Sequence, residues 1–184
     1  MKHLRRGRVY RRGDLVEWSA SVDRHLMELV DGGILKKLSH GLYYYPKYTV
    51  FGMVPPDEKV LVSSFLKDDK FLLTSPNDYN KLGVGTTQLY NKRVVYNRKR
   101  HGEIELGGRT FFFHMKDHFP SKVSEEFLLV DLLNNINTLA EDKQEVLKKV
   151  EKRVHTMNCE KLQKAVKSYG TVRTKKVYNQ LSNS

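Results

Sequence analysis

Apolar side chains in residues 14–31 follow helical spacing in two short stretches. Residues 14–18 fit one or two helical turns, and residues 19–21 are typical of a turn. In the next stretch the apolar positions fall at i, i+4, i+7 and i+8, on one helical face: Val22, Leu26, Leu29 and Val30. A Gly-Gly pair at residues 32–33 predicts the end of this helix, because glycine accepts the left-handed conformation that follows a last helical turn.

A hairpin is predicted after the glycine pair. Residues 34–38 and 42–45 are short β-prone runs on either side of a Ser-His-Gly turn. Residues 46–56 contain three prolines and one glycine, which is typical of a linker. We therefore place a first domain at residues 1–48.

Residues 49–120 are predicted to form a second domain of α+β type. The expected elements are a helix over residues 57–66, a strand over 70–74, a short helix beginning at Pro76, and strands over 94–96 and 110–114 joined by a polar connection over 98–108.

After Pro120 the apolar pattern becomes helical and stays so to the last residues. Apolar stripes cover residues 127–136, 146–154 and 162–169, and a final short helix is expected around residues 177–181. Such stripes most often pack helices against one another. We place a helical C-terminal region at residues 121–184.

The order helix, turn, helix, glycine and hairpin within residues 8–46 is that of a winged helix-turn-helix. The expected fold class is therefore α+β, with a winged helix-turn-helix first, an α+β domain second and a helical tail last. A DNA major groove admits one α-helix, and its base edges carry a readable donor and acceptor pattern. In such proteins a second helix braces the reader and the hairpin reaches the adjacent backbone.

The helix over residues 22–31 is the candidate reader of base edges. At about 100° per residue, Arg24 points almost directly away from the apolar face, with Ser21 and His25 beside it. Arg24 suits a guanine edge or a phosphate. Ser19 and Ser21, together with the helix N-terminus, suit a phosphate.

Basic side chains on the hairpin and before the first helix complete the candidate interface. The hairpin turn is expected to reach a phosphate or the minor groove. The additional residues are Arg8, Arg11, Arg12, Lys36, Lys37 and His40. These contacts are expected to set affinity and salt dependence rather than sequence choice.

The formal net charge of +12 and the isoelectric point of about 9.7 indicate a polyanionic partner. DNA, RNA and an anionic membrane surface all fit this charge, and residues 1–50 are the most basic part per residue. The single cysteine, Cys159, suits a reducing cytosol. No run of about 18 apolar residues predicts a membrane span, and no apolar stretch after the N-terminus predicts a signal peptide. We therefore expect a cytoplasmic protein.

Patterns for catalysis or metal binding are incomplete. His114 and His118 have the spacing of two zinc ligands, without a second pair or cysteine cluster to complete four. Glu103 and Glu105 alternate on a strand-like stretch downstream of Asp78, and no lysine follows as in restriction-like nucleases. The sequence has neither a phosphate-binding loop nor a Gly-x-Ser-x-Gly nucleophile motif. We expect no enzyme activity, no cofactor and no metal site.

Five segments together resemble one known family. They read GDLVEWSASVDRHLMELVDGGILKKLSHGLYYYPKY, FGMVPPDEKV, LTSPNDYNKLGVGTTQ, KRVVYNRKR and RTFFFHMKD, and span about residues 7–118. Their content and order resemble the AbiEi family, the antitoxins of type IV toxin–antitoxin systems. The resemblance implies a winged helix, with its reader at residues 21–31 and its wing at residues 36–45, followed by an α+β antitoxin domain.

The same resemblance implies a regulatory function. It implies binding to double-stranded DNA at inverted repeats in the protein's own promoter, as a homodimer on the DNA, and repression of its own operon. It also implies neutralisation of a co-encoded nucleotidyltransferase toxin, in many cases without a stable complex between the two.

Two other classes of function stay open from the residues alone. One is a winged-helix module that binds protein or RNA without an antitoxin role. The cluster Tyr43, Tyr44, Tyr45 and Tyr48 fits stacking on bases of RNA or of single strands. The more common role of such a cluster is packing in the core and beside the hairpin. The other is a metal-dependent nuclease. Steep salt dependence with preference for the protein's own promoter separates the DNA regulator from the first class. Magnesium-dependent cleavage of nucleic acid identifies the second.

Overall fold

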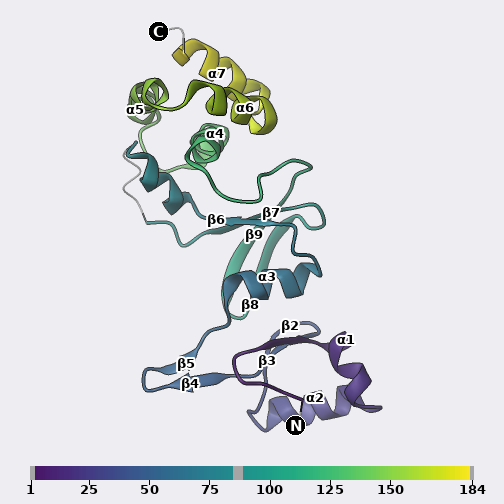
Figure 1. The fold of residues 1–184 in the computed structure, drawn as a ribbon. Coiled ribbons are helices and arrows are strands. Elements are labelled where there is room, and N and C mark those ends of the chain that lie inside the picture. Colours follow the sequence, from purple (N-terminus) through teal and green to yellow (C-terminus); the bar gives the residue numbers. More distant parts are fainter. Residues whose placement is uncertain (1–2, 85–88, 183–184) are drawn as a thin grey trace. The chain divides into compact units, whose positions relative to one another are not determined.

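The computed structural model describes residues 3–84 and 89–182, which form a mixed α+β protein of two compact units (Figure 1). The first unit is formed by residues 1–70 and 102–111, and the second by residues 71–101 and 112–184. This division differs from the three consecutive segments expected from the sequence, with boundaries after residues 48 and 120. Each unit combines segments that are far apart in the sequence. The local amino-acid composition does not indicate where these segments begin and end.

The first unit contains an antiparallel sheet of three strands with β3 at its centre. The strands are β1 (Val9–Arg11), β2 (Lys36–Ser39) and β3 (Leu42–Tyr44). Val9 and Lys36 both pair with Tyr44, one from each side. The expected hairpin is thus confirmed as β2 and β3. β1 was not expected, because three residues paired with a strand about thirty positions away leave no periodic signal.

Two helical segments connect β1 to β2: α1 (Arg12–Leu15), continued by the 3-10 turn η1 (Val16–Trp18), and α2 (Val22–Asp31). Their apolar side chains pack on the sheet in one cluster of buried residues: Tyr10, Leu15, Val22, Leu26 and Leu35. The prediction of a helix over residues 22–31 is confirmed. Its glycine stop is confirmed as well, since Gly33 has a φ of +67°.

Residues 46–56 form a second hairpin, so their prediction as a linker was wrong. β4 (Lys47–Thr49) pairs antiparallel with β5 (Gly52–Val54), and Gly52 closes the turn with a φ of +102°. The prolines in this stretch flank the ladder instead of interrupting it, and a proline outside a ladder costs no strand hydrogen bond.

The helix expected over residues 57–66 is confirmed as α3 (Glu58–Leu66), with Asp57 accepting a hydrogen bond from Val60 N as its N-cap. A further sheet has the strand order β6-β7-β9-β8. Its strands are β6 (Leu72–Thr74), β7 (Arg93–Asn97), β8 (Gly102–Leu106) and β9 (Arg109–Met115). β8 lies in the stretch expected to be a polar connection.

The second unit is built around helix α4 (Glu125–Asn135), whose buried side chains join the main cluster of that unit. The remaining elements are η2 (Pro76–Leu82), η3 (Ile136–Thr138), α5 (Lys143–Thr156), α6 (Cys159–Tyr169) and α7 (Val172–Ser182). The helices expected after Pro120 are therefore confirmed. Among the helices of residues 3–84 and 89–182, none has the length and apolar run needed to cross a bilayer.

Candidate nucleic-acid interface

The turn before α2 positions the predicted reader residues. The hydroxyl of Ser19 accepts a hydrogen bond from Ser21 N at 3.1 Å, which fixes the chain where the helix begins. Ser21, Arg24 and His25 are exposed. The angular argument from the sequence, which places Arg24 on the outward face of this helix, agrees with this exposure.

Among the described residues, the Arg24 side chain makes long contacts only. It is 69% exposed, its Nε lies 3.7 Å from Glu28 Oε1, and its Nη2 lies 3.5 Å from His25 Nε2. Donation to His25 Nε2 requires the ring proton on Nδ1, which then donates to Ser19 Oγ at 2.7 Å. Because distances near 3.5 Å and beyond are at the limit of hydrogen bonding, the guanidinium can leave these contacts for a stronger acceptor.

Two of the predicted arginines already hold carboxylates of the protein. Arg11 binds Asp14 with its Nη2 at 2.8 Å from Oδ1, and this pair closes the first turn of α1. Arg12 forks onto Asp23, with Nε–Oδ1 and Nη2–Oδ2 both at 2.6 Å. The hydrogen bond from each arginine lowers the pKa of its carboxyl partner. Both pairs are exposed to water, where exchange for a phosphate oxygen is inexpensive.

The predicted hairpin contacts lie along the strands and not at one tip. His40 is exposed in the turn, next to Gly41, whose carbonyl accepts a hydrogen bond from Arg12 N at 2.8 Å. Lys36 and Lys37 are exposed at the other end of β2, opposite Tyr44 and Tyr43. The structure therefore brings His40 close to Arg12 and separates it from the two lysines.

Three further basic residues border the same sheet and were not predicted: Arg5, Arg6 and Lys47. Gly7 N donates to Tyr45 O at 2.7 Å, and a Cβ on Gly7 would lie 3.7 Å from the Lys47 side chain. The Arg6 guanidinium lies 5.8 Å from the centre of the Tyr45 ring. The run Arg5-Arg6-Gly7-Arg8 without a carboxylate was the sequence signal for this basic edge.

Charge is strongly uneven within the first unit. Residues 14–31 carry five carboxylates against one arginine: Asp14, Glu17, Asp23, Glu28 and Asp31 against Arg24. Residues 3–13 and 32–56 carry eight basic side chains and no carboxylate: Arg5, Arg6, Arg8, Arg11, Arg12, Lys36, Lys37 and Lys47. Within the described part of the chain, five of these eight form no ion pair and no ring contact: Arg5, Arg8, Lys36, Lys37 and Lys47.

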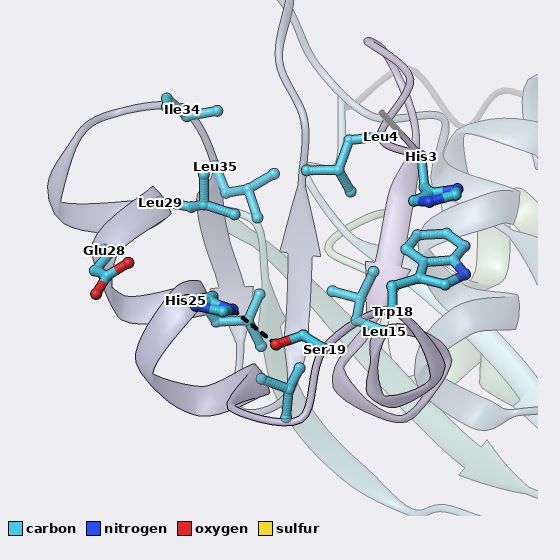
Figure 2. A pocket seen from close by; sticks show the side chains of 12 residues that line it. His3, Leu4, Leu15, Trp18, Ser19, His25, Glu28, Leu29, Ile34 and Leu35 are labelled. Atoms are coloured by element: carbon cyan, nitrogen blue, oxygen red, sulfur yellow. Dashed lines mark hydrogen bonds between the residues drawn. The ribbon is translucent and has the colours of Figure 1, made fainter. Parts of the chain in front are cut away.

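An open groove of about 480 Å³ runs between η1 and α2 (Figure 2). Figure 2 shows Trp18 and His3 on one side of it, and Leu29 and Ile34 on the other. The ring of Trp18 stacks on His3 at 5.1 Å and is 44% exposed. Most of its lining is apolar, and its polar members are His3, Ser19, His25 and Glu28.

A buried carboxylate ties the second unit together. Asp131 accepts hydrogen bonds from Tyr79 OH at 2.8 Å and from Tyr96 OH at 2.7 Å, which joins α4 to η2 and β7. Burial raises the pKa of Asp131, and the two phenol donors oppose that rise. Lys116 lies 4.0 Å from the centre of the Tyr96 ring, and burial lowers the pKa of this lysine. Because both carboxylate oxygens have donors, the network serves as a structural anchor.

Residues considered for metal or nuclease chemistry do not gather into a site. No three His, Cys, Asp or Glu side chains of residues 3–84 and 89–182 come together as metal ligands do. Glu103 and Glu105 are exposed on β8. Asp78 binds Lys81 at 2.7 Å and accepts from Ser75 N in a capping box, so it stabilises η2.

Comparisons with known proteins give one result. A family model described as a family of unknown function (DUF6088) matches residues 1–167 of the chain. Comparison with curated proteins and with solved structures finds no match. The chemistry of the interface therefore follows from the chain's own residues.

Proposed function

Since the chain belongs to the DUF6088 family, which carries no assigned activity, we propose from its own residues that its N-terminal unit is a winged helix-turn-helix that binds double-stranded DNA. The order of elements supports this: β1, a helical pair ending in α2, then the β2–β3 hairpin, with β3 central in the sheet. In winged helices the second helix of the pair reads the major groove and the hairpin meets the backbone.

The observation that carries the proposal is the carboxylate-free distribution of basic side chains in residues 3–13 and 32–56. Each phosphate contact by a lysine or arginine releases condensed counterions, and this release supplies most of the sequence-independent affinity. The exposed residues Arg8, Lys36, Lys37 and Lys47 fit this role because no carboxylate within residues 3–84 and 89–182 pairs with them.

Arg24 has a different role in the proposal. It is the single lysine or arginine of α2, and its long contacts to Glu28 and His25 leave its five donors available for a guanine edge. The neighbouring carboxylates Asp23 and Glu28 repel phosphates, so α2 contributes selectivity while the basic segments contribute affinity.

Salt titration of DNA binding tests the proposal. A fluorescent duplex is titrated with the protein between about 50 and 200 mM salt, and the slope of log affinity against log salt is measured. Changing Lys36→Ala together with Lys37→Ala is expected to reduce that slope by about 2, because each phosphate contact contributes about 0.9. The matched control is Lys148→Ala with Lys149→Ala on α5, two exposed lysines of the second unit, which should leave the slope unchanged. Equal slopes for the wild type and the β2 variant would remove the hairpin from the interface.

The proposal extends to an antitoxin that represses its own operon, and this part is supported only by the resemblance to AbiEi proteins. To test this role, a nucleotidyltransferase encoded in a neighbouring reading frame is expressed in cells with and without this chain, and its toxicity is measured as growth. Growth rescue supports the antitoxin role. Toxicity that persists overturns this role and leaves DNA binding in place.

A further inference from the structure

The hairpin formed by β4 and β5 ends in apolar side chains that the protein leaves uncovered. Val50 is 95% exposed and Phe51 is 97% exposed, at the two positions of the turn. Tyr48 and Met53 pair across the two strands just behind the turn, and they are 61% and 37% exposed. Scattered apolar residues are common on protein surfaces, but four within one short hairpin indicate a contact surface.

This hairpin is anchored and its tip is braced. The phenol of Tyr44, buried in the sheet, donates a hydrogen bond to Val54 O at 2.6 Å. At the tip, Thr49 Oγ1 accepts from Phe51 N and donates to Gly52 O, both at 3.3 Å. The two apolar side chains are therefore held outward before any partner arrives, so little ordering is required on binding.

The charge around the hairpin identifies a polyanion as the partner. The hairpin carries Lys47 and no carboxylate, and residues 32–56 contain no carboxylate at all. The chain at Gly7 runs against Lys47, which brings Arg6 and Arg8 to the root of the hairpin. A protein groove that took only the apolar tip would gain nothing from this concentration of positive charge, whereas a nucleic-acid duplex offers phosphates beside stacked apolar bases.

We propose that the β4–β5 hairpin enters the minor groove of double-stranded DNA and inserts Phe51, supported by Val50, as an apolar wedge between base pairs. The inference rests on the proposed DNA binding and adds how the hairpin contacts the duplex. Val50 lies three positions after Lys47 in the chain, a reach of about 10 Å at about 3.3 Å per residue. The minor groove is about 7.5 Å deep. The tip thus reaches the bases while Lys47 and the arginines at its root meet the flanking phosphates.

An inserted wedge partly unstacks one base step and kinks the duplex toward the major groove. The kink also opens the minor groove, which makes room for a two-stranded turn that is wider than the undistorted groove. Bending is therefore the signature that separates a wedge from simple attachment to the backbone.

The test uses the full chain and a mixed-sequence duplex of about 30 base pairs with a fluorescent dye at each end, so that affinity and bending are read together. Wild-type protein is expected to bind and to raise energy transfer between the dyes. Phe51→Ser is expected to lower affinity about tenfold and to abolish the rise in energy transfer, whereas Phe51→Leu retains both. The control is Val172→Ser, which removes another exposed apolar side chain, 75% exposed, from α7 and should change neither reading.

Each outcome decides between specific alternatives. Wild-type protein that fails to bind any duplex overturns both this inference and the proposed function. Binding without bending, or Phe51→Ser protein that binds and bends like the wild type, overturns the wedge and leaves DNA binding intact. If Phe51→Ser instead abolishes self-association in sedimentation, or binding to vesicles of anionic lipid, the tip serves a second copy or a membrane, and the wedge is overturned.

Discussion

The proposed base reader, Arg24, sits in an acidic neighbourhood. Its guanidinium lies 3.7 Å from Glu28, and the preceding residue, Asp23, is already held by Arg12. A phosphate close to α2 would meet these carboxylates first and be repelled, whereas a base edge in the groove presents acceptors without a net charge. The local electrostatics therefore favour base contact over phosphate contact for this one residue.

Changing Arg24→Ala is expected to weaken binding to the protein's own promoter by about 1–3 kcal/mol while leaving binding to unrelated duplex nearly unchanged. The physical reason is the loss of a bidentate contact to one base. Fluorescence anisotropy with promoter and scrambled duplexes measures both affinities. Glu28→Gln is the companion variant. It is expected to increase the affinity for both duplexes slightly, because it removes a negative charge that repels DNA. An unaltered promoter affinity for Arg24→Ala contradicts the reader role.

The raised pKa of Asp131 predicts how the stability of the fold changes with pH. Burial raises its pKa above the ordinary value of 3.8, so the folded protein holds this proton more tightly than the unfolded chain. The stabilisation from this proton is complete below pH 3.8 and is lost as the pH rises through the folded pKa. Lys116 and His114 also act on Asp131, and both lower its pKa, against the dominant effect of burial.

Asp131→Asn removes this titration while it keeps the side-chain shape. The variant is therefore expected to gain stability relative to the wild type as the pH rises from about 4 to 8, measured as unfolding free energy in urea. A difference between the two proteins that stays constant over this range would show that the carboxyl has no raised pKa. Asp131→Ala serves as a second reference, since it leaves two phenols without an acceptor and should cost about 2–5 kcal/mol at every pH.

At the scale of elements, the sequence predicted those whose pattern is local and missed those defined by distant partners. α2 was predicted because its stripe of apolar residues and its glycine stop lie within twelve positions. β1 and β8 were missed because each becomes a strand only through a neighbour in space. The β4–β5 hairpin was mistaken for a linker because its prolines, which flank the ladder, resemble linker composition.

A partly buried hydrogen bond ties the root of the β4–β5 hairpin to the three-stranded sheet. Tyr44→Phe removes the phenol that binds Val54 O, and the expected cost is about 1–2 kcal/mol because a partly buried carbonyl loses its donor. Amide exchange of the hairpin, followed by NMR, should accelerate more than exchange in α2. Tyr48→Phe is the matched control, since Tyr48 is exposed on the same hairpin. Equal exchange rates in the two variants would show that this bond does not anchor the hairpin.

At the scale of the whole molecule, the residues predicted to bind DNA lie within one unit, whereas the predicted domain boundaries differ from the division into units. All ten residues proposed from the sequence lie in the first unit, and the structure adds Arg5, Arg6 and Lys47 beside them. The boundaries expected after residues 48 and 120 were drawn where composition shifts. The first unit instead includes residues 102–111, which lie far along the chain and pack with residues 1–70. Contacts between such distant segments are determined by packing, which local patterns in a single sequence do not predict.

The packing of residues 102–111 with residues 1–70 leads to a prediction about fragments of the chain. Leu106 is fully buried, Gly107 N donates to Leu38 O at 3.1 Å, and Arg109 binds Glu58 at 3.0 Å, all within the first unit. A fragment ending at Lys70 lacks these partners and exposes the apolar surface that they cover. It should therefore show no cooperative transition in urea, although it contains every residue of the proposed DNA interface.

A second fragment separates this cause from simple shortening. It joins residues 1–70 to residues 102–111 through a flexible Gly-Ser linker and restores the missing strand and its hydrogen bonds. This fragment should regain a cooperative transition, and with it binding to duplex DNA, because the helical pair and the hairpins then rest on a complete core. Cooperative unfolding of the shorter fragment alone would mean that residues 1–70 already hold enough buried surface to fold, and that residues 102–111 are only attached to them.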